Sequence, residues 1–439
     1  MDTSRRTFIK SAAVLGGLCL TGCISMPTAK SAQNDGNILI KNANLFEREG
    51  AFDIAVKDGK IAEIGKNIQY KAPVIDAAGC FVSPGFVDSH MHLDKAYTLG
   101  EGEDLKSAIR LSADYFKNIP PDRLAEDIYR RSRALADKAL ANGTTTIKTH
   151  LVTYGRKDLL LASIEATVQL AKDYRDRIEI LNVTPWMAAA EKELTDAVKN
   201  GDINFLSANA QPEAKGSYEK RVYELFRAAA DFNLPIDMHL DESDIPDVGA
   251  LNLVLDETIR YKMGGRVTGG HITTISAQGM DETEAAKAIQ KAKDAGINVI
   301  TLPSSNLFLM GRSDKKPIRR GITRVHEFLE AGVNVAYASD NVRDHFRPFG
   351  NADMLEEGLL TAQVMQYGSQ KELRTIYKMG TYNAAANCLL PNYGLNEGCY
   401  ADLVILDAPS AEEAILSQSL KLYALKRGKI MAQNGKLIV

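Results

Sequence analysis

The sequence predicts an α/β fold, a (β/α)8 TIM barrel with a small β-sandwich domain built from the N- and C-terminal flanks. Eight short apolar runs alternate with helix-period segments, glycines recur just before the runs, and strand-like pieces with hairpin turns stand at both ends of the chain. Eight such units in roughly 270 residues match the size of a (β/α)8 barrel.

Composition and length agree with a globular protein of more than one domain. The 439 residues exceed what one core usually supports. Hydrophobic residues at 45% and charged residues at 25% exclude a disordered, collagen-like or coiled-coil chain. The formal net charge of −3, without a long basic run, argues against nucleic acid as a partner. Five cysteines are too few for a disulfide framework.

The first residues have the pattern of an export signal. Arg5 and Arg6 precede a short apolar stretch, which is typical of the twin-arginine route, and the stretch is too short for a permanent membrane span. Leu-Thr-Gly before Cys23 resembles a bacterial lipobox, which implies cleavage there and lipidation of the thiol. We expect a signal peptide over 1–22, a tether over 23–36, and a lipid-anchored protein of the periplasm or cell envelope. The alternative is an uncleaved anchor behind a chance arginine pair.

The two flanks are predicted to form one domain over 37–84 and 391–439. The first flank contains the strand-like runs Ile38–Ile40, Ile54–Val56 and Ile61–Ile64, and the second contains Leu403–Leu406, Tyr423–Leu425 and Ile430–Met431. Asp58-Gly59 and Asn434-Gly435 are predicted hairpin turns. The first and last strands of a barrel are neighbours, so these half-sets can pair without a long connection.

The barrel itself is predicted over 85–390. Its strands are β-rich runs bounded by glycine, asparagine or aspartate: Phe86–His92, Thr144–Leu151, Ile178–Trp186, Ile203–Ala208, Ile236–Leu240, Val267–His271, Ile297–Leu302 and Val333–Ala338. Gly143, Gly201, Gly296 and Gly332 are placed to end helices. A doubly wound open sheet is the alternative, but no glycine-rich nucleotide fingerprint follows an early strand.

Five of the seven histidines stand at the carboxyl ends of these predicted strands, where barrels carry their active sites. They are His90 and His92 on the first strand, His150 on the second, His239 on the fifth and His271 on the sixth, with Asp340 ending the eighth. Residues i and i+2 of a strand point to the same side, so both histidines of the first strand face the barrel mouth. With His239 and Asp340 they form a ligand set that suits zinc or ferrous iron.

Acid–base groups accompany this ligand set. Glu242 follows His239 by three residues, where a carboxylate can move the proton of a metal-activated water. His271 can polarise the reacting group and Asp340 can accept a proton. The alternative for Glu242 is a solvated loop charge. His326 lies in a predicted helix, and we interpret it as structural.

These residues resemble the amidohydrolase superfamily. His90-Met91-His92 after Pro84-Gly85-Phe86-Val87-Asp88 matches its strand-1 signature, and the later His239, His271 and Asp340 fall in its expected order. The resemblance implies that His90, His92, His239 and Asp340 are metal ligands and that Glu242 and His271 take the acid–base roles. No lysine ends the third or fourth strand, which implies one divalent metal, Zn or Fe.

Within the superfamily the chain is most similar to cytosine deaminases and N-isopropylammelide amidohydrolases. The shared stretches are His92–Lys95, Arg319–Val325, Ala338–Asn341, Pro348–Met354 and Ala401–Val404. Asn341 stands where cytosine deaminases have a second aspartate, and Trp186 stands where they have a substrate-reading glutamine. Glu242, by contrast, matches the glutamate of the cytosine deaminases. Trp186 either stacks on a flat ring or caps the core. His150, Trp186, Asn306 and Asn341 are the expected substrate contacts.

The expected function is therefore metal-dependent hydrolysis of a C–N bond, which deaminates or N-dealkylates a small nitrogen heterocycle such as a pyrimidine, purine or triazine. One alternative is a hydrolase of cyclic amides or amino-acid amides with the same metal chemistry. A second is a non-catalytic ligand-binding lipoprotein. The expected partners are the small-molecule substrate and, through Cys23, a membrane. The oligomeric state is open, a homo-oligomer included.

Overall fold

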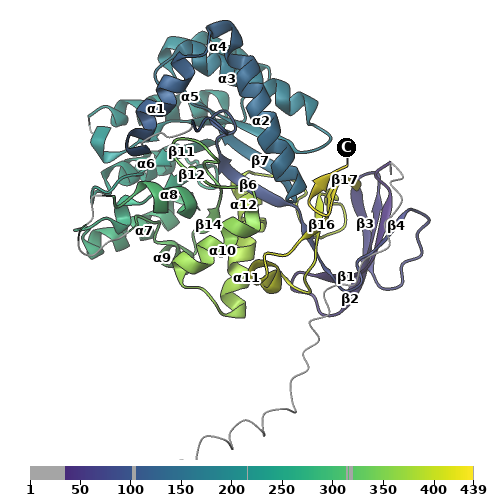
Figure 1. Ribbon diagram of the computed structural model, residues 1–439. Coiled ribbons are helices and arrows are strands. Elements are labelled where there is room, and N and C mark those ends of the chain that lie inside the picture. Colours follow the sequence, from purple (N-terminus) through teal and green to yellow (C-terminus); the bar gives the residue numbers. More distant parts are fainter. Residues whose placement is uncertain (1–34, 101–104, 215, 313–314, 316–319, 439) are drawn as a thin grey trace, which may run out of the picture.

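The computed structural model describes residues 35–100, 105–214, 216–312, 315 and 320–438, which form a parallel barrel beside a second sheet (Figure 1). The predicted signal peptide with Arg5 and Arg6, and the predicted tether from Cys23 to residue 34, lie outside these residues. Among the described helices, none combines the length and the apolar character that crossing a membrane requires.

The eight predicted barrel strands are confirmed, each to within a few residues. In chain order they are β6 (Phe86–Met91), β7 (Thr144–His150), β8 (Glu179–Pro185), β9 (Phe205–Ser207), β11 (Ile236–Leu240), β12 (Val267–His271), β13 (Asn298–Thr301) and β14 (Asn334–Tyr337). They pair in parallel in that order, and the short strand β10 (Asn209–Ala210) also pairs with β11. Because all eight run in the same direction, their carboxyl ends meet at one rim.

The barrel closes through the backbone of a residue beyond the last strand. Asp340 forms an isolated parallel bridge with Met91 of β6. Its N–H donates to the His90 carbonyl at 2.9 Å, and its carbonyl accepts from the His92 N–H at 2.9 Å. This closure ties the eighth strand segment to the first and sets Asp340 beside two histidines.

Helices surround the barrel in the expected alternation (Figure 1). They are α1 (Ala108–Lys117), α2 (Leu124–Ala141), α3 (Lys157–Asp173), α4 (Glu191–Lys199), α5 (Tyr218–Phe232), α6 (Gly249–Arg260), α7 (Glu282–Ala295), α8 (Pro303–Leu309), α9 (Val325–Glu330), α10 (Met354–Met365), α11 (Gln370–Met379) and α12 (Tyr382–Asn387). Gly296 ends α7 in the left-handed conformation, with φ of 68°, which a residue without a Cβ adopts at little cost. The buried faces of most of these helices pack on the outer side chains of the strands in one large apolar cluster, and those of α1, α2 and α12 pack in smaller ones.

Strands from both ends of the chain form the second sheet. It contains β1 (Ile38–Leu45), β2 (Ala51–Lys57), β3 (Lys60–Gly65), β4 (Val74–Asp76), β5 (Phe81–Pro84), β15 (Leu403–Leu406), β16 (Lys421–Lys426), β17 (Lys429–Gln433) and β18 (Lys436–Leu437), with α13 (Ala411–Leu416) after β15. The predicted turns Asp58-Gly59 and Asn434-Gly435 connect paired strands, and all four residues have positive φ.

The predicted separate domain built from both flanks is confirmed, and hydrogen bonds join its strands into one continuous sheet. β5 is the reason, because it pairs in parallel with β1 on one side and antiparallel with β15 on the other. The N-terminal and C-terminal strands therefore share one ladder, and they enclose an apolar cluster separate from that of the barrel.

Gly85 is the single residue between β5 of this sheet and β6 of the barrel. Its N–H donates to the Asp402 carbonyl at 2.8 Å, and its carbonyl accepts from the Tyr393 hydroxyl at 2.8 Å. A Cβ at this position would lie 2.2 Å from Cγ2 of Thr145. The two domains thus meet at a point with no room for a side chain.

We predict that Gly85→Ala destabilises the protein by about 1–3 kcal/mol or more, because either Thr145 or the backbone has to move. Gly368→Ala is the matched control, since a Cβ there meets no atom within 4 Å and the change should stay within about 0.5 kcal/mol. Denaturant unfolding of both variants measures the difference. Equal stability of the two variants would contradict the conclusion that Thr145 leaves no room for a side chain at Gly85.

Candidate metal centre

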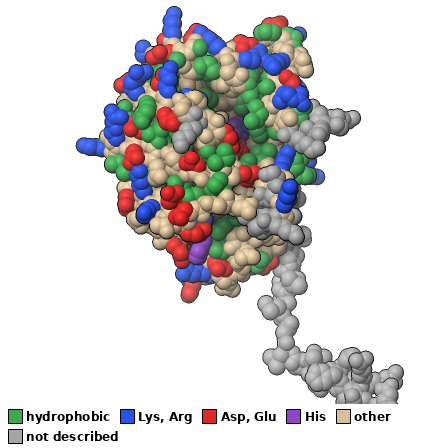
Figure 2. Space-filling view, turned by 90° about the vertical axis from the view of Figure 1, so that its left-hand side faces the viewer, with side chains coloured by type: hydrophobic (Ala, Val, Ile, Leu, Met, Phe, Trp, Pro, Cys, Tyr) green, Lys and Arg blue, Asp and Glu red, His purple; other side chains and the backbone are tan. Residues whose placement is uncertain are grey.

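The structure brings the predicted histidines together at the carboxyl rim of the barrel. They stand at or next to the ends of the four strands β6, β7, β11 and β12, and each is buried or nearly so: His90, His92, His150, His239 and His271. Figure 2 shows a hollow walled by hydrophobic side chains, in which histidine and acidic side chains are visible. His326 lies apart from them, exposed in α9, where its Nδ1 is 2.7 Å from the Tyr367 hydroxyl.

Four of the predicted ligands converge. One nitrogen from each of His90, His92 and His239 and one oxygen of Asp340 lie within 4.8 Å of one another. Nε2 of His92 is 3.0 Å from Nε2 of His239, and Oδ1 of Asp340 is 3.4 Å from the same His92 nitrogen. Nε2 of His90 is 3.8 Å from that Asp340 oxygen. Three imidazoles and a carboxylate in this arrangement are a typical ligand set for a divalent metal.

The hydrogen bonds of these side chains fit a metal ion. Nδ1 of His92 lies 3.0 Å from the carbonyl oxygen of His150, which can only accept, so Nδ1 carries the proton and Nε2 presents a lone pair. Both ring nitrogens of His90 and Nδ1 of His239 have no hydrogen-bond partner among the described residues. Buried nitrogens without partners are costly in a folded protein, and a bound cation would satisfy those that face the cluster.

The environment also keeps the ligands neutral. Burial lowers the pKa of His90 and His239 well below the ordinary value, and neighbouring histidines lower both further. Burial and then the charge of Lys95 lower the pKa of His92 in the same direction. A neutral imidazole is the form that binds a metal, so the site is ready for one near neutral pH.

Glu242 and His271 form the neighbouring acid–base pair. Glu242 follows β11, and its Oε1 is 3.6 Å from Nδ1 of His271. Burial raises the pKa of Glu242, against the charge of His271, so this carboxyl holds a proton more readily than an exposed one. The Glu242 side chain is 17% exposed whereas that of His271 is 1% exposed, which places the carboxyl nearer to solvent and substrate.

Asn306 of α8 contacts His271 directly. Its Nδ2 is 3.0 Å from Nδ1 of His271, and the Thr323 hydroxyl donates to the His271 carbonyl at 2.5 Å. An amide that donates to Nδ1 leaves Nε2 of the ring as the N–H donor. His271 and Asp340 have φ of 73° and 57°, a strained conformation that clusters at functional sites.

The other predicted substrate contacts are engaged within the protein. Asn341 donates through Nδ2 to Asp344 at 2.6 Å and accepts from Ser305 at 3.5 Å. Trp186 directly follows β8, and its ring packs 5.7 Å from that of Phe232 at the end of α5. Of the two roles open from the sequence, this contact favours capping of the core.

His150 lies against the ligands themselves. Its ring stacks on His90 with 3.8 Å between centroids, and its Nε2 is 3.2 Å from Oδ1 of Asp237. Burial lowers the pKa of His150, although Asp237 opposes this effect. The side chain therefore contacts a metal ligand and an acidic group, and its role as a substrate contact stays a prediction.

Three buried charged residues near the site escaped the sequence reasoning: Lys95, Lys148 and Asp237. The Lys95 ammonium lies 4.1 Å from the ring centre of Phe346, and its charge acts on His92, His239 and Glu242. Lys148 and Asp237 each precede a rim histidine by two residues on the same strand, so they share that histidine's side of the strand. This two-residue spacing was the sequence pattern from which Lys148 and Asp237 could have been predicted near the site.

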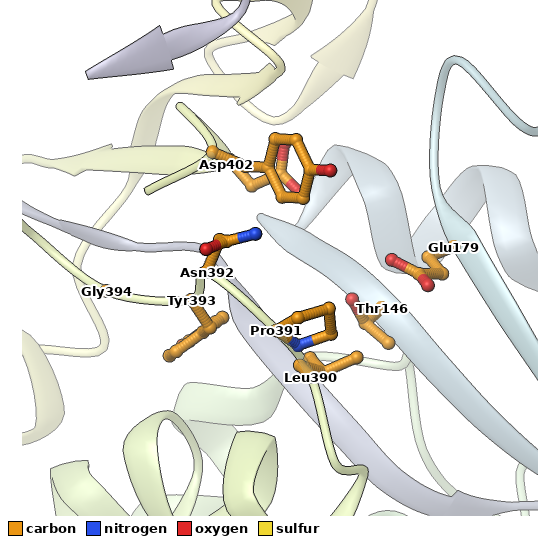
Figure 3. Close-up of a pocket in the computed structure, with 9 residues that line it drawn as sticks. Thr146, Glu179, Leu390, Pro391, Asn392, Tyr393, Gly394 and Asp402 are labelled. Atoms are coloured by element: carbon orange, nitrogen blue, oxygen red, sulfur yellow. The ribbon is translucent and has the colours of Figure 1, made fainter. Parts of the chain in front are cut away.

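A separate pocket lies at the opposite end of the strands. It is lined by Thr146 and Glu179, near the starts of β7 and β8, and by the loop from Leu390 to Gly394, with Tyr400 and Asp402 (Figure 3). No histidine lines it. The pocket is therefore separate from the histidine cluster at the carboxyl rim.

Comparison with known proteins agrees with this site. Residues 73–178 and 186–431 match the amidohydrolase family, which is more than half of the chain. N-isopropylammelide isopropyl amidohydrolase of Pseudomonas sp. strain ADP is 29% identical over 424 residues, which are 92% of this chain and 99% of that protein. Pterin deaminase of Rhizobium rhizogenes is 28% identical over 86% of this chain and 87% of its own length.

A solved structure also resembles the fold. The 5-methylcytosine deaminase of Klebsiella pneumoniae, liganded with 5-fluorocytosine, superposes with a TM-score of 0.81 at 29% identity. The match covers 90% of this chain and 97% of that one. Both domains described above thus have a counterpart of known structure.

We predict that His239→Ala abolishes tight metal binding, because it removes the only ligand that β11 contributes to the cluster. His326→Ala is the control, since this histidine is exposed, contacts the Tyr367 hydroxyl and lies outside the metal cluster. Metal analysis of both purified variants after dialysis is the measurement. Full metal content in His239→Ala would contradict the ligand assignment.

Proposed function

The chain belongs to the amidohydrolase family and is a metal-dependent hydrolase of carbon–nitrogen bonds, and on this premise we propose that it removes an amino or alkylamino group from a nitrogen heterocycle. The proposed rings are of pyrimidine, purine or triazine type. The observation that carries the proposal is the buried cluster of His90, His92, His239 and Asp340 with Glu242 and His271 beside it. The relatives named above act on isopropylammelide, pterin and methylcytosine, which supports a heterocyclic substrate.

In this proposal His90, His92, His239 and Asp340 hold one divalent ion, Zn or Fe. Such an ion supplies Lewis acidity, which lowers the pKa of water at the site toward neutrality. The three neutral imidazoles and the single carboxylate support this assignment, since zinc and ferrous iron both accept these ligands.

The proton transfers fall to Glu242 and Asp340. Glu242 accepts the proton of the attacking water and returns one to the ring nitrogen or to the leaving amine. Partial burial raises the pKa of the Glu242 carboxyl above its ordinary value, which suits a group that must both take up and release a proton. Asp340, already tied to the His90 and His92 backbone, accepts the second proton of the water.

His271 and Lys95 stabilise the negative charge that develops on the substrate. His271, held by Asn306, offers Nε2–H as a hydrogen-bond donor at the reacting carbon's oxygen. Lys95 is buried, and its positive charge acts on Glu242 and His239. This charge favours a substrate ring that carries an electronegative oxygen. His150, Asn306 and Asn341 remain the proposed lining of the substrate site, whereas Trp186 packs on Phe232.

The test is an ammonia- and amine-release screen across aminopyrimidines, pterins, purines and aminotriazines, with product masses recorded. Loss of the amino group with an intact ring is the expected product, and Glu242→Gln should lower kcat by about 10²- to 10⁴-fold at unchanged metal content. Ring opening, or release from amino-acid amides only, would instead support a cyclic-amide or amino-acid amide hydrolase. Unchanged ligand after long incubation with metal-replete protein would overturn the catalytic assignment.

We also propose that the protein is exported by the twin-arginine route and anchored to the cell envelope through a lipid on Cys23. The proposal is supported by Arg5-Arg6, the apolar stretch that follows and the Leu-Thr-Gly-Cys run. Folded proteins use this route, so a metal can be loaded before export.

For export, we expect Arg5→Lys/Arg6→Lys to leave the protein in the cytoplasm and Cys23→Ser to release it as a soluble periplasmic form. Cys399→Ser is the control for a cysteine outside the signal. Fractionation and incorporation of labelled fatty acid measure both effects. Membrane attachment of Cys23→Ser at wild-type levels would refute the lipid anchor.

A further inference from the structure

A charged layer lies inside the barrel beneath the metal cluster. Lys148 of β7 and Asp237 of β11 are fully buried and precede His150 and His239 by two residues, so their side chains enter the barrel below these histidines. The interior of such a barrel is usually filled by branched apolar side chains. A buried ion pair therefore stands here in place of the apolar side chains that usually fill a barrel.

The two side chains are held on all sides by protein groups. The Lys148 ammonium contacts Oδ2 of Asp237 and donates to Oδ1 of Asn387 at 2.8 Å. Thr268 of β12 donates to the same amide oxygen at 2.9 Å. The ammonium also lies 4.7 Å from the ring centre of Phe205. This places Asp237 at a defined position with one carboxylate oxygen left over.

That remaining oxygen faces two histidines. Oδ1 of Asp237 is 3.2 Å from Nε2 of His150 and 3.9 Å from Nδ1 of His90. The His90 ring stacks on His150, and Gly270 of β12 leaves room for it, since a Cβ there would lie 3.1 Å from Cε1 of His90. The carboxylate thus lies on the side of His90 that points away from Asp340.

Asp237 and Asp340 face opposite nitrogens of the His90 ring, at 3.9 Å from Nδ1 and 3.8 Å from Nε2. With a metal ion held at Nε2, the ring proton is on Nδ1, and Asp237 is the acidic group that faces this proton. His150, contacted by the same carboxylate, accepts from Nδ1 of His92 through its main-chain oxygen. Asp237 therefore contacts His90 directly, and it contacts His150, whose carbonyl oxygen holds His92 just after β6.

We propose that Lys148 and Asp237 are positioning residues that hold His90 and His150 so that the metal cluster is preformed before the ion binds. This inference rests on the metal site of the proposed function. His90, His150 and Asp237 alone could also gather around a cation. The ammonium of Lys148 already neutralises Asp237 and repels a further cation, so the lower layer orients the ligands and binds no ion of its own.

If the Lys148–Asp237 pair had only a structural role, its removal would change the stability of the fold and leave the metal affinity unchanged. A buried ion pair contributes little net stability, but removal of one partner leaves the other charge buried and unpaired. Lys148→Met and Asp237→Asn alone should therefore both destabilise the fold. The double variant Lys148→Met/Asp237→Asn removes both charges at nearly constant volume, and its thermal stability should return toward that of the wild type.

The discriminating measurement is the Co²⁺ affinity of the full chain after metal removal, by competition with a chelator, together with the visible spectrum of the Co²⁺ protein. We expect the double variant to bind Co²⁺ about 10- to 100-fold more weakly, with an altered spectrum, even where its stability is restored. The matched control is Lys421→Met/Asp353→Asn, a largely buried ion pair between β16 and the start of α10. It should alter stability without changing Co²⁺ affinity.

Two results would overturn the positioning role. One is wild-type Co²⁺ affinity and spectrum in the double variant. The other is two ions per wild-type chain that fall to one in Asp237→Asn, because Asp237 would then be a ligand. A wild-type chain that binds no Co²⁺ would instead contradict the metal site on which the proposed function depends, so the two failures are distinguishable.

Discussion

The backbone bridge between Asp340 and the end of β6 is the contact on which the site depends. It closes the barrel, because the last strand segment has to reach the first, and it does so through two hydrogen bonds to His90 and His92. The same bridge sets the Asp340 carboxylate among the imidazoles. Fold closure and assembly of the ligand set are therefore one event, and any change that opens the barrel also takes the cluster apart.

Burial then determines the chemical state of the cluster. Imidazoles removed from water lose the tendency to bind a proton, so His90, His92 and His239 present lone pairs. Charged side chains near the cluster act differently according to their exposure. Glu242 reaches toward solvent and can exchange protons, whereas the Lys148–Asp237 pair is enclosed and can only orient what it touches. The site thus combines neutral imidazoles, a carboxyl that exchanges protons and a fixed ion pair, all on or next to the strands β6, β7 and β11.

Much of this could be read from the sequence. The eight strands, both hairpin turns and the strands from both flanks are local patterns of apolar periodicity and turn residues, which depend on few neighbours. His90-Met91-His92 and the scarcity of histidine elsewhere marked the rim, since alternation along a strand is a local rule. The spacing of Lys148 to His150 and of Asp237 to His239 obeys the same rule, but only two strands seen together give it meaning.

Sequence alone determined the fold class, the rim and the identity of the candidate ligands, because strand periodicity and the parallel direction of all eight strands place those residues at one end. Tertiary structure decided which side chains touch. The two flanks pair in one sheet through β5, and Trp186 packs on Phe232. The Asn306 amide contacts His271, and Asp237 lies between Lys148 and two histidines. Contacts between residues far apart in the chain depend on barrel stagger and rotamers, which no local pattern encodes.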